Sequence, residues 1–263
     1  AHGEIYMLGA FTALLVAGVL GIVGFPAGGI LIVAALAAVV WSAAYGYTLE
    51  KVAYKPLRGA PRLSPLISAI GMSIFLQNYV LLAQTSDYVP FPRLLPEMEF
   101  LDYLGNIMGP SDFLILVTST LAMVSLSLFI RYTRMGKAMR ATAQNRKMAL
   151  LLGINADRII SLTFIVGSAL AALGGVLIAS HMGQVNFGIG FLAGLKAFTA
   201  AVLGGIGSIP GAMVGGLVLG IAESMTTGYL SGNYEDALAF ALLILILIFR
   251  PDGILGKAKV QKV

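Results

Sequence analysis

The sequence RYTRMGKAMRATAQNRKMALLLGINADR, residues Arg131–Arg158, is the longest polar break between apolar runs in this chain. A single acid, Asp157, stands among its seven cations, which are Arg131, Arg134, Lys137, Arg140, Arg146, Lys147 and Arg158. Apolar segments long enough to cross a bilayer flank this stretch on both sides. Because Lys- and Arg-rich loops between spans stay in the cytoplasm, residues 131–158 are predicted to form a cytoplasmic loop that orients every other span.

The composition is that of an integral membrane protein. Of the 263 residues, 58% are hydrophobic and 11% are charged, whereas soluble domains carry about 25% charge. With spans of roughly 20 residues, about seven or eight crossings fit and no folded soluble domain fits beside them. We therefore expect an all-α, polytopic, single transmembrane domain over residues 1–263.

Other site classes are disfavoured. The net charge of +5 does not indicate nucleic-acid binding, because the cations cluster in short loops between spans. The chain has no cysteine, and its two histidines lie far apart in sequence. We expect neither a disulfide nor a metal site.

The spans and their orientation follow from the apolar segments and the loop charges. The basic loop 49–63 and the basic tail 250–262 are predicted to be cytoplasmic with residues 131–158, and these three segments hold 15 of the 17 Lys and Arg residues. The acidic loop 85–111 is predicted to be periplasmic. The apolar segments expected to be helical are 5–22, 30–47, 66–83, 113–130, 159–180, 191–206, 209–230 and 237–249.

One of these segments is expected to be a broken helix. Residues 191–206 are short for a span and follow VNFGIG, which suits a helix that begins within the membrane and lines a cavity. AFTALLVAG (residues 10–18) and AFTAAVLGG (197–205) match at five of nine positions and are predicted to run in opposite directions. Such an echo is typical of inverted-repeat transporters; the alternative is a chance match between apolar stretches.

Within residues 131–158 the sequence predicts a short helix with both ends marked. Asn145 is a good N-cap, and Gly153 stands where a left-handed C-cap belongs. Asn155 is expected to cap the next span, with Asp157 in its first turn. The helix is either a connector lying on the lipid surface or a docking element for a partner.

Four blocks of the chain resemble the LivH-type permease subunit of bacterial branched-chain amino acid ABC importers. They are GKAMRATAQNRKMALLLGINADRIISLTF (136–164), GFLAGLKAFTAAVLGGIGSIPGAMVGGLVLGIAES (190–224), LISAIGMSIFLQNYV (66–80) and AYGYTLEKVAYKPLR (44–58). The resemblance covers essentially the whole chain and is weakest over residues 85–111. Members of the family have another apolar span before the AHGE-type segment, so we expect this chain to lack that first span.

The resemblance implies a function and a set of partners. It implies a permease for leucine, isoleucine and valine in the bacterial inner membrane, working with a second permease, two ATPase subunits and a periplasmic binding protein. It implies no cofactor on this chain, with ATP and Mg²⁺ held by the ATPases. It also makes the short helix the coupling helix that docks into an ATPase, with docking residues expected at Ala143, Asn145, Arg146, Met148, Ala149, Leu152 and Gly153.

Fewer residues are candidates for contact with the substrate along its path through the membrane than for ATPase docking. Lys196 and Glu223 lie inside apolar spans at similar predicted depth. We expect them to pair, which either locks two helices or serves the substrate; snorkelling to the interface is a third interpretation. Gln77 and Asn78, in the middle of a span, either bond a neighbouring helix or line the path. The tentative path residues are Gln77, Asn78, Asn186, Lys196 and Glu223, with backbone groups of AHGE (1–4) and GQVNFGIG (183–190).

The motifs that the sequence lacks narrow the function. It contains no GxxxxGK[ST] phosphate loop, so ATP hydrolysis is expected of partner subunits and not of this chain. Two alternatives remain open. A permease of the same superfamily would carry another amino acid or a sugar, and a secondary transporter would couple an ion through Lys196, Glu223 or Glu4.

Overall fold

The computed structural model describes residues 2–61, 63–84, 86–92 and 109–256. Within these residues, seven helices are long and apolar enough to cross a membrane. They are α1 (His2–Ile22), α2 (Ala27–Leu49), α3 (Ser64–Ala83), α4 (Pro110–Tyr132), α7 (Ala156–Met182), α9 (Ile209–Tyr229) and α10 (Glu235–Phe249). The prediction of an all-α membrane protein with about seven or eight spans is confirmed.

The span at α10 includes the 3-10 turn Gly232–Tyr234 before it and so has 18 residues. The eighth apolar segment forms a shorter helix, α8 (Ile189–Gly204), of 16 residues. The chain divides into two compact units, Ala1–Leu192 and Ala193–Val263. The start of α8 therefore belongs to the first unit and the rest of the helix to the second.

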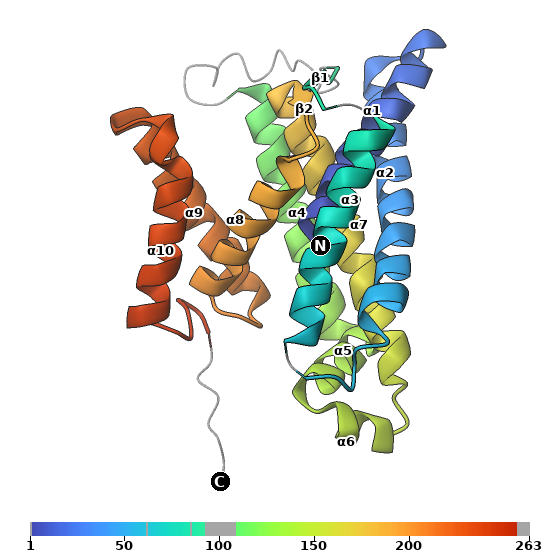
Figure 1. The fold of residues 1–263 in the computed structure, drawn as a ribbon, viewed down its shortest axis with the longest axis vertical. Helices are drawn as coiled ribbons and strands as arrows, with labels where there is room; N and C mark the ends of the chain where they lie inside the picture. The colour runs from blue at the N-terminus through green and yellow to red at the C-terminus, as the bar shows by residue number, and fades with distance from the viewer. Residues whose placement is uncertain (1, 62, 85, 93–108, 257–263) are drawn as a thin grey trace. The chain divides into compact units, whose positions relative to one another are not determined.

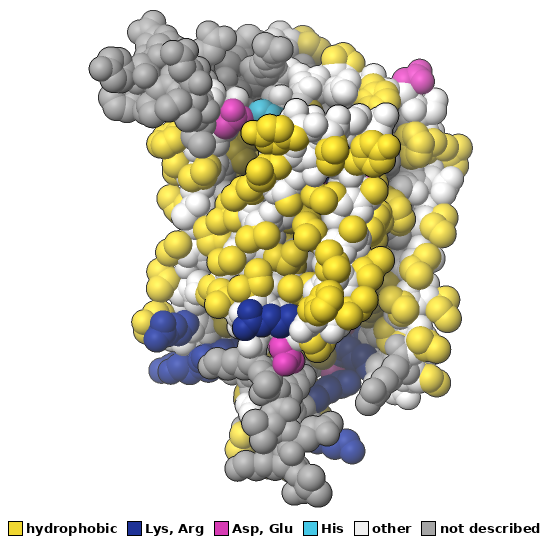
Figure 2. Space-filling model, turned by 90° about the vertical axis from the view of Figure 1, so that its left-hand side faces the viewer, with side chains coloured by type: hydrophobic (Ala, Val, Ile, Leu, Met, Phe, Trp, Pro, Cys, Tyr) yellow, Lys and Arg dark blue, Asp and Glu magenta, His cyan; other side chains and the backbone are white. Residues whose placement is uncertain are grey.

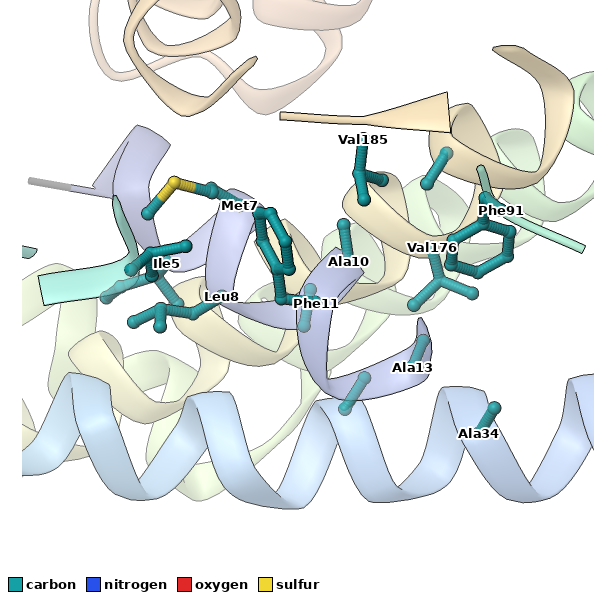
Figure 3. Close-up of a cluster of buried hydrophobic side chains, with 14 of the residues drawn as sticks. Ile5, Met7, Leu8, Ala10, Phe11, Ala13, Ala34, Phe91, Val176 and Val185 are labelled. Atoms are coloured by element: carbon teal, nitrogen blue, oxygen red, sulfur yellow. The ribbon is translucent and has the colours of Figure 1, made fainter. Parts of the chain in front are cut away.

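In the first unit, α1, α2 and α7 each pack against the other two (Figure 1). The side chains of Ile5, Met7 and Phe11 are almost fully buried and meet Val176 and Val185 in one hydrophobic cluster (Figure 3). Small residues let these helices approach closely. A Cβ atom added at Gly9 of α1 would lie 2.6 Å from the Cα atom of Ala172 on α7.

Two short strands, β1 (Val89–Pro90) and β2 (Gln184–Val185), pair antiparallel and were not predicted. The Phe91 N–H extends the pairing by donating to the Gly183 carbonyl at 2.8 Å. The ladder ties the beginning of the predicted periplasmic loop to the turn before α8. Residues 93–108 of that loop lie outside the described residues.

The basic stretch between α4 and α7 folds into two helices, α5 (Arg134–Gln144) and α6 (Arg146–Leu151). Only α6 was predicted. Thr133 caps α5 by accepting the Gly136 N–H at 3.0 Å, and Gly136, Met139 and Thr142 form its buried side. The other long loop predicted to be cytoplasmic begins with a π-helical turn, Glu50–Tyr54, that continues α2.

In the second unit, α9 packs against α10, and glycines bring α8 and α9 together. A Cβ atom at Gly215 would lie 2.8 Å from the Gly204 nitrogen. The chain after α10 returns to the end of α8, where the Ile254 N–H donates to the Leu203 carbonyl at 2.9 Å. Hydrophobic side chains make up most of the surface that is visible in Figure 2.

Candidate functional site

The short helix α6 is built with the caps that its sequence predicts. The Asn145 side chain accepts the Met148 N–H at 3.1 Å. Gly153 adopts a left-handed φ of 78°, which costs a glycine little because it has no Cβ. The Asn155 side chain accepts the Arg158 N–H at 3.1 Å and so begins α7. All three cap predictions are confirmed.

The side chains of α6 divide into a buried and an exposed side. Ala149 is only 1% exposed and faces the bundle, so its side chain is not available to a partner in this conformation. Leu151 is 81% exposed and Leu152 is 73% exposed, with Met148 and Leu150 about half exposed. The expected docking residues Ala143, Asn145 and Gly153 are also exposed, whereas Arg146 is half-buried.

A chain of ion pairs runs from α6 into the membrane helices. An Arg146 nitrogen lies 3.0 Å from Asp157 Oδ1, and Arg58 pairs with that same oxygen. Arg58 also pairs with Glu50, which is fully buried and accepts the Ser161 hydroxyl at 2.6 Å. The first residue of α6 is thereby connected to the first turn of α7 and to the π-helical end of α2.

Sequence reasoning found only part of this chain of charges. Asp157 was expected to serve the α7 dipole, and Glu50 and Arg58 were interpreted as ordinary loop charges. The signal that could have found them is that Glu50 and Asp157 are the lone acids of two basic loops. Intramolecular pairing across 99 residues, as between Arg58 and Asp157, leaves no local trace in sequence.

In the second unit, Lys196 is surrounded by carboxyl groups. Its Nζ lies 3.3 Å from Glu223 Oε1 and 3.3 Å from Asp236 Oδ1, and it also pairs with Glu235. The expected proximity of Lys196 and Glu223 is thus found. Glu235 and Asp236, in the first turn of α10, were missed because sequence did not place that turn beside α8.

The remaining candidate path residues are dispersed within the first unit. The Asn78 side chain is exposed, and its Nδ2 donates to the Ile74 carbonyl of its own helix at 2.8 Å. Gln77 is half-buried. Asn186 is half-buried in the turn before α8, where its backbone carbonyl accepts the Ile189 N–H at 3.4 Å.

A buried carboxyl group lies near that same turn. Glu4 is 1% exposed, and its Oε1 accepts the Ser73 hydroxyl at 2.8 Å. Its Oε2 has no hydrogen-bond partner in the described part of the chain. Gly190, at the start of α8, packs against Gly3 and Glu4, and a Cβ atom at Gly190 would lie 2.7 Å from Glu4 Oε2.

Comparison with known proteins gives full-length matches. A family model described as "Branched-chain amino acid transport system / permease component" matches residues 1–247. The chain is 51% identical over 267 residues to the high-affinity branched-chain amino acid transport system permease protein LivH of Escherichia coli (strain K12). The alignment covers 100% of this chain and 87% of that protein, and the same coverage and identity hold for BraD of Pseudomonas aeruginosa.

A more distant match lies outside branched-chain amino acid transport. The autoinducer 2 import system permease protein LsrC of Yersinia enterocolitica is 33% identical over 140 residues, covering 51% of this chain and 38% of LsrC. No solved structure matches the chain.

Proposed function

Because the chain belongs to the family of permease components of branched-chain amino acid transport systems, we propose that it is the translocation subunit of an ATP-driven importer for leucine, isoleucine and valine. It is a multi-pass protein of the bacterial inner membrane, with seven helices in its described part suited to crossing the bilayer. The observation that carries the proposal is the 51% identity to LivH along the full length of this chain.

The proposed assembly contains a second permease, two ATPase subunits and a periplasmic binding protein. In it, the binding protein selects the amino acid and the ATPases bind ATP and Mg²⁺. This chain supplies half of the membrane path and no hydrolytic group. Residues 131–158, with α5 and α6, then lie in the cytoplasm, and the 85–111 loop lies in the periplasm.

The ATPase is proposed to dock on the exposed apolar tip of α6. The exposed apolar side chains of α6 are those of Met148, Leu151 and Leu152. Because both ends of the helix are capped, these side chains form a well-defined apolar surface that suits a groove on the ATPase. Ala149 supports this surface from within instead of touching the partner. The lipid surface is the competing occupant, because an apolar tip beside cations also suits a headgroup layer.

Movement of the docked helix is proposed to reach the path through the ion pairs. Arg146 moves with α6, and Asp157 and Arg58 pass the displacement to α7 and to Glu50 at the end of α2. The buried Arg58–Glu50 pair tolerates little separation, so these two groups shift together. The Arg146–Asp157 pair is partly exposed and is the weaker link. The ATP-bound and ATP-free states then differ in which side of the path is open and in their affinity for the substrate, which is released from the state with the lower affinity.

The path residues stay as we expected them from sequence: Gln77, Asn78, Asn186, Lys196 and Glu223. Lys196 and Glu223 either lock α8 to α9 or meet the substrate on its way in. The four-residue charge cluster around Lys196 supports the locking role, since the amine already contacts three carboxyl groups.

The test is a reconstitution of this chain with its partner permease, two ATPases and binding protein in proteoliposomes. We expect leucine import that requires ATP and the binding protein. Import driven by an ion gradient without ATP would replace the proposal with a secondary transporter. Failure to import any branched-chain amino acid, with import of another cargo delivered by its own binding protein, would keep the mechanism and change the substrate.

The docking surface is tested by co-purification with the ATPase. Leu151→Glu and Leu152→Glu place charge on the exposed tip and are expected to release the ATPase, while Lys147→Gln on the same helix serves as the exposed control. If both glutamate variants keep the ATPase but reduce binding of the chain to anionic vesicles, α6 is a lipid-surface connector.

A further inference from the structure

We propose that the buried carboxylate of Glu4 binds the α-ammonium group of the amino acid in transit, while the beginning of α8 binds its α-carboxylate. The inference rests on the proposed function, and it assigns contacts for the two charged groups that every α-amino acid carries. It is carried by three observations: an internal repeat, the contact between its two copies, and one carboxylate oxygen without a partner.

The internal repeat is longer than the stretch first visible in sequence. Residues 2–18 and 189–205 align without a gap and are identical at seven of 17 positions. Equivalent threonines make equivalent bonds, because Thr12 Oγ1 donates to the Leu8 carbonyl at 2.7 Å and Thr199 Oγ1 to the Leu195 carbonyl at 3.0 Å. Leu8 and Leu195 are themselves equivalent, so the two segments share local structure as well as sequence.

The repeat pairs Gly3 with Gly190, and these two glycines are in contact. A Cβ atom at Gly190 would lie 2.5 Å from the Gly3 carbonyl oxygen and 2.9 Å from its carbonyl carbon, so Gly190 must lack a side chain. The start of α8 therefore lies against residues Gly3 and Glu4 of α1 inside the first unit. The N-terminus of a helix presents unpaired N–H groups and the positive end of its dipole, which suit a carboxylate.

The repeat is broken at the next position, where Glu4 corresponds to Phe191. The acid is thus present in one copy only, and its side chain is turned to the start of α8, with Oε2 2.7 Å from the Cβ position of Gly190. Oε1 is satisfied by Ser73, whereas Oε2 is buried and unpartnered among the described residues. An intramembrane acid with a free oxygen indicates a functional contact, because an unpaired buried charge is costly.

The chemistry of this junction matches a zwitterion. An α-ammonium group donates up to three hydrogen bonds and carries the charge that the Glu4 carboxylate lacks beside it. The α-carboxylate is bonded to the same Cα atom as the ammonium group. It suits the N–H groups in the first turn of α8 other than those of Ile189 and Phe191, which already donate to the Asn186 and Gly188 carbonyls. The contacts ignore the side chain of the amino acid, which fits a path that serves leucine, isoleucine and valine alike.

The junction is closed in this structure, since Glu4 is 1% exposed. Substrate therefore reaches it only when α1 and the start of α8 separate around Glu4 and Gly190. Gly188 and Gly190 allow the backbone before α8 to adjust.

The test uses the complete reconstituted transporter and measures leucine import together with ATP hydrolysis stimulated by the binding protein. Glu4→Gln keeps the size of the side chain and its capacity to accept from Ser73, but removes the charge. We expect import to fall by at least about tenfold, the effect of losing a hydrogen bond to a charged group, while stimulated hydrolysis continues. Glu4→Asp, which keeps the charge, is expected to retain more import than Glu4→Gln.

Ser73→Ala distinguishes a role of Glu4 in substrate binding from a purely structural role through its hydrogen bond to Ser73. It leaves the carboxylate in place and removes one hydrogen bond to it. Because the charge that binds the ammonium group is kept, import is expected to fall less than in Glu4→Gln. Loss of import in Ser73→Ala with full import in Glu4→Gln would overturn the proposal and make Glu4 a structural brace. Absence of ATP-dependent leucine import in the wild type is a different result, which overturns the proposed function itself.

Discussion

The guanidinium of Arg146 lies 3.0 Å from Asp157 Oδ1, and Arg58 pairs with the same oxygen from the loop that follows α2. One carboxylate oxygen therefore joins three segments that are distant in sequence: α6, the start of α7 and the loop before α3. A displacement of α6 cannot leave α7 and the end of α2 in place without separating opposite charges, one of which, Glu50, is fully buried.

Replacing Arg146 should uncouple transport from ATP hydrolysis. Arg146→Gln cuts the link at α6 but leaves the apolar tip of the helix intact, so the ATPase is expected to stay bound and to hydrolyse ATP. Leucine imported per ATP should fall by about three- to tenfold, the effect of removing one partly exposed ion pair from the coupled motion. Both quantities are measured in the same proteoliposomes.

Lys147→Gln is the matched control, because Lys147 follows Arg146 on α6 and its side chain is exposed. It is expected to change the ratio of import to hydrolysis by less than about twofold, as an exposed surface cation does. Equal effects of the two substitutions would show that the positive charge of α6 matters and the Arg146–Asp157 contact does not.

Removing Arg58 alone should destabilise the protein more than removing both members of the Glu50–Arg58 ion pair. Arg58→Met leaves the carboxylate of Glu50 buried with only Ser161 beside it, and is expected to cost about 3–5 kcal/mol of unfolding free energy. The double variant Glu50→Leu/Arg58→Met removes both charges and should recover most of that loss. Thermal unfolding in detergent measures each step, and a double variant no more stable than Arg58→Met would contradict the buried-pair interpretation.

Sequence predicted the spans and the caps of α6 because both rest on local rules. Apolar runs of about 20 residues identify membrane helices, and Asn145, Gly153 and Asn155 occupy cap positions whose chemistry is set by neighbours within a few residues. Helix α5 was missed although its sequence is amphipathic, because the prediction for the basic stretch rested on cap residues and considered only the segment between Asn145 and Gly153.

The sites were less predictable because their partners come from distant segments. Lys196 was expected to meet Glu223, but its other two partners lie on α10, and no local rule places that helix beside α8. Ala149 was expected to dock, yet it is the residue by which α6 rests on the bundle. Both cases depend on tertiary packing. A helix of six residues, such as α6, is too short for its hydrophobic periodicity to show which side is buried.

Removing the lysine from the cluster around Lys196 should lower the stability of the protein more than removing one of its acids. Lys196→Met leaves Glu223, Glu235 and Asp236 to repel one another and is expected to lower stability clearly. Glu223→Gln leaves the amine with two carboxylates and should cost less. Detergent unfolding of the two single variants and the double variant gives the coupling between Lys196 and Glu223. A smaller loss for Lys196→Met than for Glu223→Gln would rule out the lysine as the centre of the cluster.

The contact between α2 and α7 depends on a glycine. A Cβ atom at Gly46 would lie 2.6 Å from the Cβ atom of Ser168 and 3.2 Å from the Phe164 carbonyl oxygen. Gly46→Ala is therefore expected to cost about 1–3 kcal/mol by overpacking. At Gly220 in α9 nothing lies within 4 Å of an added Cβ atom, so Gly220→Ala should instead stabilise the isolated chain by about 0.5–1 kcal/mol through helix propensity.

Exchanging the small and the larger residue across this contact tests its geometry directly. In Gly46→Ala/Ser168→Gly the added methyl group takes the space that the serine side chain leaves, and stability should return toward wild type, apart from the cost of glycine within α7. Because α2 and α7 are also the helices joined to α6 by ion pairs, we expect Gly46→Ala to reduce import as well. In the double variant, import should recover together with stability. Recovered stability without recovered import would show that Ser168 acts in transport and not only in packing.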